Sequence, residues 1–357
     1  MAYTTIDDPS AYFQIALYNG NAGTQSVVND GNSDLQPDMV WIKCRSGTHG
    51  TENHNLYDSV RGATKFLIPN GTTVSTTDTN SLTAFNSDGF SLGTRTDVNG
   101  SGAYCGWQWK AGGSASSNSN GNITSSVSAN TTAGFSIVSW TGDNSGSATI
   151  GHGLGAIPDV VIIKNGTDAT NWGVKHGSMS SGHMAVLNGT DPSSDRNGST
   201  NGGIGNLTSS TTFGFIGGGA GVPEVNGSSD SMIAYCFTSI KGFSKHGSYT
   251  GNGNANGTFV YLGFRPAWVM FKRSDNTADW YIYDNKRNPF NVLDDRLEAN
   301  NSGAEAGDGD AGNIVDYVSN GFKLRGTGGS MNDGTFVYMA FAESPFVTST
   351  GIPTTAR

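Results

Sequence analysis

An internal repeat is the feature that most constrains how this chain can fold. A proline followed by an apolar run that ends in lysine occurs three times, as Pro37–Lys43, Pro158–Lys164 and Pro266–Lys272. The three prolines lie 121 and then 108 positions apart. A fixed order of landmarks at this spacing indicates tandem copies of one structural unit. We therefore expect three domains of about 110 residues each.

Other landmarks keep the same order around each proline. A strand end with an aromatic residue and glycine precedes it, and a short aromatic or amide-rich segment follows it. A Phe-centred segment comes next, and each copy closes on an aromatic-rich segment. The Phe-centred segments are 88–92, 212–215 and 320–324, and the closing segments are 104–109, 232–237 and 336–341. Short aromatic or β-branched segments bounded by Gly, Asn, Asp and Pro predict strands.

The fold class that follows is all-β, with three tandem β-sandwich domains of jelly-roll type and minimal helix. The run after each proline is almost continuously apolar, which predicts a central strand buried on both faces. The segment 90–92 alternates instead, which predicts a half-buried strand. Helix is expected only as a turn or two near 58–66 and 311–318.

Composition and spacing place the boundaries. The predicted units are residues 1–112, 132–242 and 243–346, followed by a C-terminal arm at 347–357. Residues 113–131 are rich in Ser, Asn and Gly, which is typical of a flexible polar linker, although this segment could also pack as a long surface strand. Almost nothing separates the second and third copies, so we expect this pair to be held rigidly.

Composition also excludes several classes of protein. The 357 residues include 52 Gly, and only 14% are charged, which disfavours helical bundles and coiled coils. A net charge of −9 without a long basic run disfavours nucleic-acid binding. Cys44, Cys105 and Cys236 are too few and too widely spaced for a disulfide framework and are interpreted as buried thiols. The first residues lack a basic leader, and no apolar run spans a bilayer, so we expect synthesis in a cytoplasm without membrane insertion.

Three motifs could carry chemistry, and each has a plainer interpretation. Gly89–Gly93 matches the GxSxG nucleophile pattern, but Gly214 and Lys323 occupy the place of Ser91 in the other copies, which indicates a solvent-facing strand position. His49, Glu52 and His54 could ligate zinc or nickel, but they lie in a loop with glycine and are interpreted as solvated. Glu305–Asn313 resembles a calcium loop in composition without the ligand order of one, so an acidic loop is the alternative.

Acidic residues offer little for catalysis. The pattern Asp-x-x-Arg occurs at Asp58–Arg61 and Asp284–Arg287 and predicts an ion pair that fixes a turn. The second copy has His176 and Met179 at these places, so the pair is not required by the fold. Glycosidases need two carboxylates at a set separation. Asp294, Asp295 and Glu298 are present, but their separation cannot be read from the sequence.

Aromatic side chains on loops can stack on sugars. Trp172, Trp280 and Tyr281 are the candidates for contact with a glycan, with a place in the sandwich core as the alternative. No catalytic, cofactor-binding or metal-binding residue is predicted, and no cofactor is expected.

Several stretches resemble virion structural proteins of marine tailed bacteriophages, including proteins described as tail fibres. The resemblance is carried by residues 5–13, 57–66, 134–142, 151–158, 247–253 and 263–267 and covers nearly the whole chain. It implies a particle protein made in the host cytoplasm and brings no catalytic residues with it. The implied partners are capsid or tail proteins and a host surface glycan, and a homo-oligomer is expected, with a trimer as one form.

The sequence therefore favours a non-enzymatic protein on the virion surface. A tail-associated adhesin and a capsid decoration protein are both compatible with it. The alternative is a phage-tail polysaccharide depolymerase, which would need two close acids in a cleft.

Overall fold

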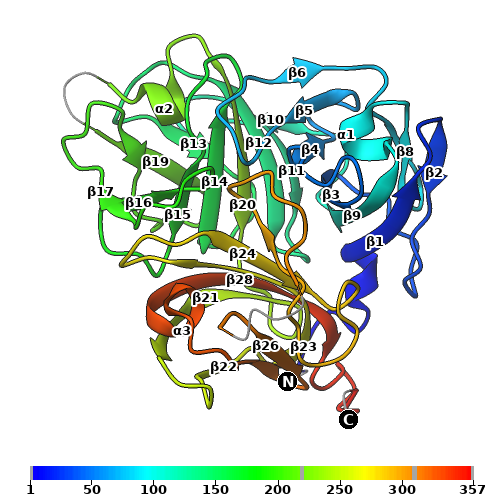
Figure 1. The fold of residues 1–357 in the computed structure, drawn as a ribbon. Helices are drawn as coiled ribbons and strands as arrows, with labels where there is room; N and C mark the ends of the chain where they lie inside the picture. The colour runs from blue at the N-terminus through cyan, green and yellow to red at the C-terminus, as the bar shows by residue number, and fades with distance from the viewer. Residues whose placement is uncertain (1–2, 218–220, 308–311, 355–357) are drawn as a thin grey trace.

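The chain folds into three lobes of β-structure that meet at a common centre (Figure 1). A computed structural model describes residues 3–217, 221–307 and 312–354. Strands make up 43% of the chain and helices 4%, which confirms the all-β prediction. Each lobe combines one large antiparallel sheet with one three-stranded sheet.

The strands of each lobe follow one another across its large sheet and then across its small sheet. The first lobe contains β1 (Phe13–Gly20), β9 (Gly102–Trp109), β3 (Met39–Ser46), β4 (Asn55–Asp58), β5 (Lys65–Leu67) and β6 (Thr76–Thr77), then β2 (Gln25–Val27), β8 (Phe90–Leu92) and β7 (Leu82–Phe85). The second contains β10 (Ser116–Asn118), β11 (Ser125–Asn130), β12 (Phe135–Thr141), β20 (Ser231–Phe237), β14 (Val160–Asn165), β15 (Gly173–His176), β16 (His183–Val186) and β17 (Ser194–Asp195), then β13 (Thr149–Gly151), β19 (Thr212–Ile216) and β18 (Gly203–Ile204). The third contains β21 (Ser244–Asn252), β28 (Asp333–Pro345), β23 (Phe264–Arg273), β24 (Trp280–Asp284) and β25 (Leu297–Glu298), then β22 (Phe259–Tyr261), β27 (Gly321–Leu324) and β26 (Val315–Val318).

The three lobes share one topology. In each large sheet the closing aromatic strand, β9, β20 or β28, lies between the first strand of the copy and the strand after the proline. In each small sheet the Phe-centred strand, β8, β19 or β27, lies in the middle. The sequence landmarks therefore correspond to equivalent strands. The second lobe adds β10 and β11 at one edge.

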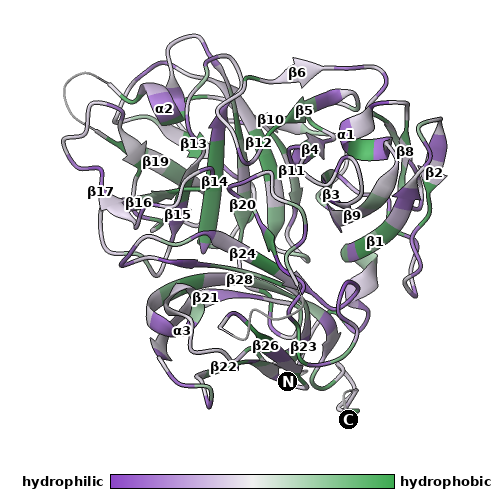
Figure 2. Ribbon diagram, viewed as in Figure 1, coloured by the Kyte–Doolittle hydropathy of each residue, from purple (hydrophilic) through white to green (hydrophobic). Residues whose placement is uncertain are grey.

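The strands after the prolines are buried on both faces, as predicted. Val40 and Ile42 of β3 point into the interior of the first sandwich, whereas Met39 and Trp41 point into a different core at the centre of the molecule. β14 and β23 alternate in the same way. β14 is accordingly hydrophobic along most of its length (Figure 2). A strand between two cores needs apolar residues at successive positions, which explains the unbroken run.

The central core joins the three lobes into one unit. It contains Trp107 of the first lobe, Tyr235 of the second and Met339 of the third, all from the closing strands. The first strand also reaches the last one, because the rings of Phe13 and Phe341 stack at 5.2 Å. Each lobe keeps a separate core of its own between its two sheets.

Equivalent hydrogen bonds link the lobes in a closed ring. The residue just before β4, β15 or β24, or at its start, donates from its ring to a backbone carbonyl of a neighbouring lobe. The pairs are Trp172 Nε1 to Ile68 O (2.9 Å), Trp280 Nε1 to Val186 O (2.9 Å) and His54 Nε2 with Glu298 O (3.1 Å). The second lobe thus bonds the first, the third bonds the second, and the first bonds the third.

A second set of contacts runs round the ring in the opposite direction. The last residue of β4, β15 or β24 bonds the closing strand of the next lobe. The pairs are Asp58 Oδ2 with Tyr235 OH (2.7 Å), His176 Nε2 with Tyr338 O (3.1 Å) and Asp284 Oδ2 with Trp107 Nε1 (3.0 Å). The two sets together give the chain an approximate threefold arrangement.

The recurring lysine at the end of each apolar run is buried at a junction between lobes. Lys164 Nζ donates to Thr72 O of the first lobe at 3.2 Å, and Lys272 Nζ donates to Thr190 O of the second at 2.8 Å. Lys43 Nζ bonds Gly50 O within its own lobe at 2.6 Å. Burial lowers the pKa of each of these ammonium groups to about 8.

The expected helical turns near 58–66 and 311–318 are wrong. Residues 59–64 form tight turns, because the carboxylate of Asp58 holds Arg61 and ends β4. Val315–Val318 is strand β26, and residue 311 lies outside the described residues. One-turn helices lie instead before each closing strand: α1 (Thr96–Asn99), α2 (Pro223–Asn226) and α3 (Gly329–Asn332), and a 3-10 turn, η1, spans Pro9–Ala11.

Each of these one-turn helices ends on a buried asparagine. The side-chain amides of Asn99, Asn226 and Asn332 donate to loop carbonyls, namely Gly93 O (2.7 Å), Ser145 O (3.3 Å) and Gly326 O (2.9 Å). These asparagines replace backbone donors in the loops that lead into the closing strands.

Of the two alternatives for residues 113–131, the structure has the strands. β10 and β11 pair with each other, and β11 pairs with β12, so this segment extends the second large sheet. In the expected C-terminal arm, the described residues fold back on themselves through a bridge between Val347 and Pro353, and Ser349 bonds Asp7 near the start of the chain. None of the helices in the described ranges has the length and hydrophobicity needed to cross a membrane.

Candidate functional site

The loop between β24 and β25 distinguishes the third lobe from the other two. Nine positions separate Asp58 from Leu67 and His176 from Ala185, which pair equivalently in the first two lobes. Thirteen positions separate Asp284 from Leu297 in the third. The four additional residues lengthen this loop on an otherwise repeated scaffold, and loops on a rigid scaffold are where binding residues concentrate.

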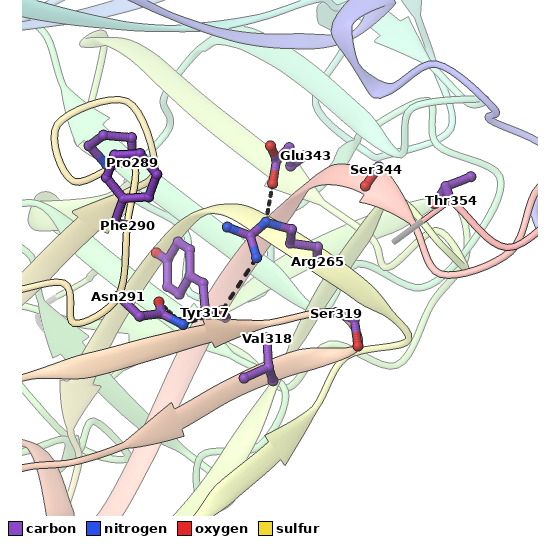
Figure 3. Close-up of a pocket in the computed structure, with 10 residues that line it drawn as sticks. All are labelled: Arg265, Pro289, Phe290, Asn291, Tyr317, Val318, Ser319, Glu343, Ser344 and Thr354. Atoms are coloured by element: carbon purple, nitrogen blue, oxygen red, sulfur yellow. Dashed lines mark hydrogen bonds and ion pairs between the residues drawn. The ribbon is translucent and has the colours of Figure 1, made fainter. Parts of the chain in front are cut away.

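The longer loop forms one wall of a surface hollow of about 450 Å³ (Figure 3). The loop contributes Pro289, Phe290 and Asn291, and the opposite wall comes from neighbouring strands. Those further lining residues are Arg265 of β23, Tyr317 and Val318 of β26, Ser319 after it, Glu343 and Ser344 of β28, and Thr354.

Asn291 fixes the loop against the edge of β26. Its Nδ2 donates to Tyr317 O at 2.9 Å, and its Oδ1 accepts from Tyr317 N at 2.9 Å. The side chain therefore makes the two bonds that a neighbouring strand would make. This anchoring leaves the adjacent Phe290 ring 76% exposed, the most exposed of the large apolar side chains in the described structure.

Arg265 and Glu343 provide the charges of the hollow. Arg265 Nε is paired with Glu343 Oε2, and Arg265 NH1 also lies 3.5 Å from Tyr317 O. The two residues come from paired strands, β23 and β28, so the position of the ion pair is fixed by the sheet. Figure 3 shows the guanidinium of Arg265 between Glu343 and Tyr317.

This arrangement suits binding better than hydrolysis. An exposed aromatic ring can stack on the apolar face of a sugar, and a paired guanidinium and carboxylate can bond its hydroxyls. Glu343 is the single acid among the ten described residues that line the hollow. Hydrolysis of a glycosidic bond by the usual route requires two carboxyl groups.

The three residues predicted from sequence for glycan contact lie in the interior. Trp172 is 0% exposed, Trp280 2% and Tyr281 4%. Both indoles donate to carbonyls of a neighbouring lobe, and Tyr281 packs in the core of the third lobe. Their rings cannot reach a sugar in this structure, so they have the alternative role in the core. A comparison of loop lengths between the copies could have indicated Phe290.

Ser91 lies where a strand residue of a small sheet should lie. It pairs with Ser26 of β2, and its Oγ lies 3.0 Å from Ser26 Oγ and 2.9 Å from Asn86 Nδ2. The one-turn helix α1 begins at Thr96, so Ser91 is not at a strand-to-helix turn. These bonds match the interpretation of a solvent-facing strand position.

The candidate metal ligands are separated by the fold. His49 Nδ1 lies 3.5 Å from Glu52 Oε1 on the surface, whereas His54 is buried and accepts from Trp41 Nε1 at 2.9 Å. Burial holds the pKa of His54 well below its usual range. Among the described residues no group of three His, Cys, Asp or Glu side chains is arranged to hold a metal ion.

The acidic segment Glu305–Asn313 is described only in part, because residues 308–311 lie outside the described residues. Glu305 pairs with Arg45 at 2.7 Å and with Arg287 at 2.9 Å. These arginines lower the pKa of the Glu305 carboxyl against the effect of its burial. Its carboxylate therefore joins the first and third lobes.

The two Asp-x-x-Arg pairs form as predicted. Arg61 Nε lies 2.5 Å from Asp58 Oδ2, and Arg287 Nε lies 2.6 Å from Asp284 Oδ2. His176 occupies the equivalent strand position in the second lobe.

The three acids considered for hydrolysis, Asp294, Asp295 and Glu298, have polar partners. Asn288 Nδ2 lies 3.3 Å from Asp294 Oδ1 and 3.0 Å from Asp295 Oδ2, and Arg296 Nε lies 3.2 Å from Glu298 Oε1.

Comparison with known families gives one match. Residues 8–345 match the profile of a family described as a domain of unknown function, DUF7483. The chain belongs to this family. One DUF7483 profile spans all three lobes, so the family is defined by the whole three-lobed unit. No curated protein and no solved structure matches the chain.

Proposed function

We propose that this protein is a non-enzymatic structural protein of a bacteriophage virion, exposed on the particle surface. It is associated with the tail as an adhesin or bound to the capsid as a decoration protein, and it contacts host surface glycans. The proposal rests on the resemblance to virion proteins and on one observation of the structure. That observation is the lengthened loop of the third lobe, which presents Phe290 beside Arg265 and Glu343.

The closed ring of lobes supports a structural role. Its junctions are held by buried hydrogen bonds and a shared apolar core rather than by a cleft between mobile domains. The proposed partners are other virion proteins, and a homo-oligomer, including a trimer, stays a prediction. The site contains neither a nucleophile nor a second acid among its described lining residues.

The alternative is a polysaccharide depolymerase. Asp294 and Asp295 lie near each other in the same lengthened loop, and burial with the nearby Glu305 charge raises the pKa of Asp295. A raised carboxyl pKa is one property of a general acid. Asp295 would then need a second carboxylate across a bound sugar.

Two experiments test the proposal. Mass spectrometry of purified particles should find the protein at a stoichiometric level, and its absence would remove the virion role. A glycan array probed with the purified protein should give signals that are lost in Phe290→Ala and retained in Phe259→Ala, an exposed phenylalanine of β22 outside the hollow. Release of reducing ends from a bound polysaccharide would favour the depolymerase instead.

A further inference from the structure

The three junctions between lobes have equivalent geometry and different chemistry. At each one a backbone N–H beyond the fifth strand position of a lobe donates to the carbonyl two residues after the lysine of a neighbouring lobe. The bonds are Ser75 N to Gly166 O (2.9 Å), Ser193 N to Ser274 O (3.1 Å) and Glu305 N to Arg45 O (2.9 Å). The side chains around these bonds can therefore be compared position by position.

The junction of the first and second lobes is an open groove of about 730 Å³. Ten of the residues that line it carry hydroxyl groups: Ser75, Thr77, Ser117, Thr124, Ser125, Ser126, Ser139, Thr141, Thr167 and Ser231. The register places Ser117, Ser126 and Ser139 side by side on β10, β11 and β12. The Ser-rich segment 113–131 thus builds much of one wall.

The hydroxyl row continues the face that forms the central core. Ile137 and Ser139 point to the same side of β12, as do Ile233 and Ser231 of β20. Ile137 and Ile233 are buried in the central core, whereas Ser139 and Ser231 lie beyond it in the groove. The face changes from apolar to hydroxyl-bearing where it leaves the core, so the groove is built to meet a polar ligand or water.

The charge of the groove is positive in a protein of net charge −9. Arg61 and Lys65 line it, and none of its described lining residues is acidic. Arg61 is held by Asp58 beneath it and reaches Ser75 Oγ at 3.3 Å. The ammonium of Lys65 is exposed and has no ion-pair partner in the described structure.

The other two junctions lack this combination. At the second–third junction, Met179, His183 and Asp275 occupy the places of Arg61, Lys65 and Thr167, in a hollow of about 400 Å³. At the third–first junction, Arg45, Glu305 and Arg287 pair with one another. The strands β10 and β11 extend only the second large sheet.

We propose that the groove between the first and second lobes binds an acidic polysaccharide. Rows of hydroxyl side chains bond sugar hydroxyls, and Lys65 and Arg61 attract carboxylate or sulfate groups on the chain. Nucleic acid fits less well, because the groove's one aromatic residue, Trp140, is buried and offers no exposed face for a base. The inference extends the proposed contact with glycans to a second site, and it depends on none of the residues around Phe290.

The equivalent junction supplies a matched test. Thr167 Oγ1 accepts from Ser231 N at 2.9 Å, and Asp275 Oδ2 accepts from Thr335 N at 2.9 Å in the same place. Thr167→Asp therefore keeps the structural hydrogen bond and adds a negative charge to the groove. Asp275→Thr makes the reverse exchange at the second–third junction and serves as the control.

Isothermal titration calorimetry with oligogalacturonate, a neutral maltooligosaccharide of equal length and an oligothymidylate tests the proposal. Wild type and Asp275→Thr should bind oligogalacturonate alike, whereas Thr167→Asp and Lys65→Ala should each bind at least about fivefold more weakly, with the effect reduced at high salt. Circular dichroism should show the four proteins equally folded.

Three outcomes would overturn the proposal. They are no binding of oligogalacturonate by wild type, equal or tighter binding of the neutral sugar or oligothymidylate, and unchanged affinity in Thr167→Asp. None of these results bears on whether the protein is found in particles or whether Phe290→Ala loses a glycan signal, so failure here is separable from failure of the proposed function.

Discussion

The junction between the third and first lobes and the junction between the second and third lobes occupy equivalent places but use opposite chemistry. At the first of these, Asp284, Arg287 and Glu305 form a buried charged network that also accepts from Trp107. At the second, His176 bonds Tyr338 O, and His246 packs against Phe237 and Phe341. Burial lowers the pKa of His176 to about 4 and that of His246 to about 3, so both are neutral at pH 7.

The difference shows what the fold requires at a junction. The strand order and the bonds to backbone carbonyls are the same at both, so they set the geometry. Charged or neutral side chains can then complete the junction, provided that every buried group has a partner. The two junctions should consequently respond to different perturbations.

Asp284→Ala should give the largest effect. It leaves the guanidinium of Arg287 buried with half of its ion pairing and removes the acceptor of Trp107 Nε1. Removing one partner of a buried pair costs about 3–5 kcal/mol of unfolding free energy. Equilibrium denaturation measures it, and His176→Ala at the equivalent position should cost less, about 1–2 kcal/mol for a neutral bond. A larger loss in His176→Ala would contradict the comparison.

Mild acid should destabilise the histidine junction. The folded-state pKa values of His176 and His246 lie below the ordinary value of 6.5, so the unfolded chain binds more protons as the pH falls below 6.5. Stability is fully present above pH 6.5 and falls until the pH reaches the folded pKa. At a pH of about 5.5 each histidine should cost about 1.4 kcal/mol.

The matched variant is His246→Phe, which should lose its share of this pH dependence between about pH 7.5 and 5.5. Groups elsewhere titrate equally in both proteins, so the difference between the two profiles isolates His246. Parallel profiles would show that His246 is not buried neutral.

The repeated indole bonds should give smaller and equal effects. Trp172→Phe and Trp280→Phe each remove one bond of 2.9 Å to a neighbouring lobe and leave a carbonyl without its donor. Each should cost about 1–2 kcal/mol, measured by denaturant unfolding. Unequal losses would mean that the two junctions are not energetically equivalent.

The smallest effect is expected at Ser91. Its hydroxyl lies on the half-exposed face of β8 and bonds only Ser26 and Asn86. Ser91→Ala should change stability by less than about 0.5 kcal/mol and leave any hydrolytic activity of the preparation unchanged. A lost activity would restore the GxSxG interpretation.

The sequence predicted the strands well because each one carries local signals. Pro158 and the apolar run after it identify a doubly buried strand without knowledge of its neighbours. The threefold ring was not predicted, because the bonds that close it join residues far apart, such as Trp107 and Asp284. The lysine that ends each run shows the same limit, since its partners include carbonyls of another lobe.

The site was harder to predict than the fold. Trp172 and Trp280 follow the pattern of exposed loop aromatics, yet the ring buries them against neighbouring lobes. Phe290 carries no local signal of its own, and only the greater length of its loop relative to the other copies marks it. The hydroxyl-lined groove likewise depends on two lobes, so the Ser-rich segment alone indicated a linker as readily as a wall.

The contact of Phe13 with Phe341 has a consequence for how the protein is made. The first lobe emerges from the ribosome with part of its apolar surface meant for partners that have not yet been synthesised. That surface stays wet until β28, the last long strand, has left the exit tunnel. During this interval the nascent chain is a target for chaperones and for pairing with other unfinished copies. A truncation shortly before β28 should therefore aggregate rather than give a smaller soluble protein.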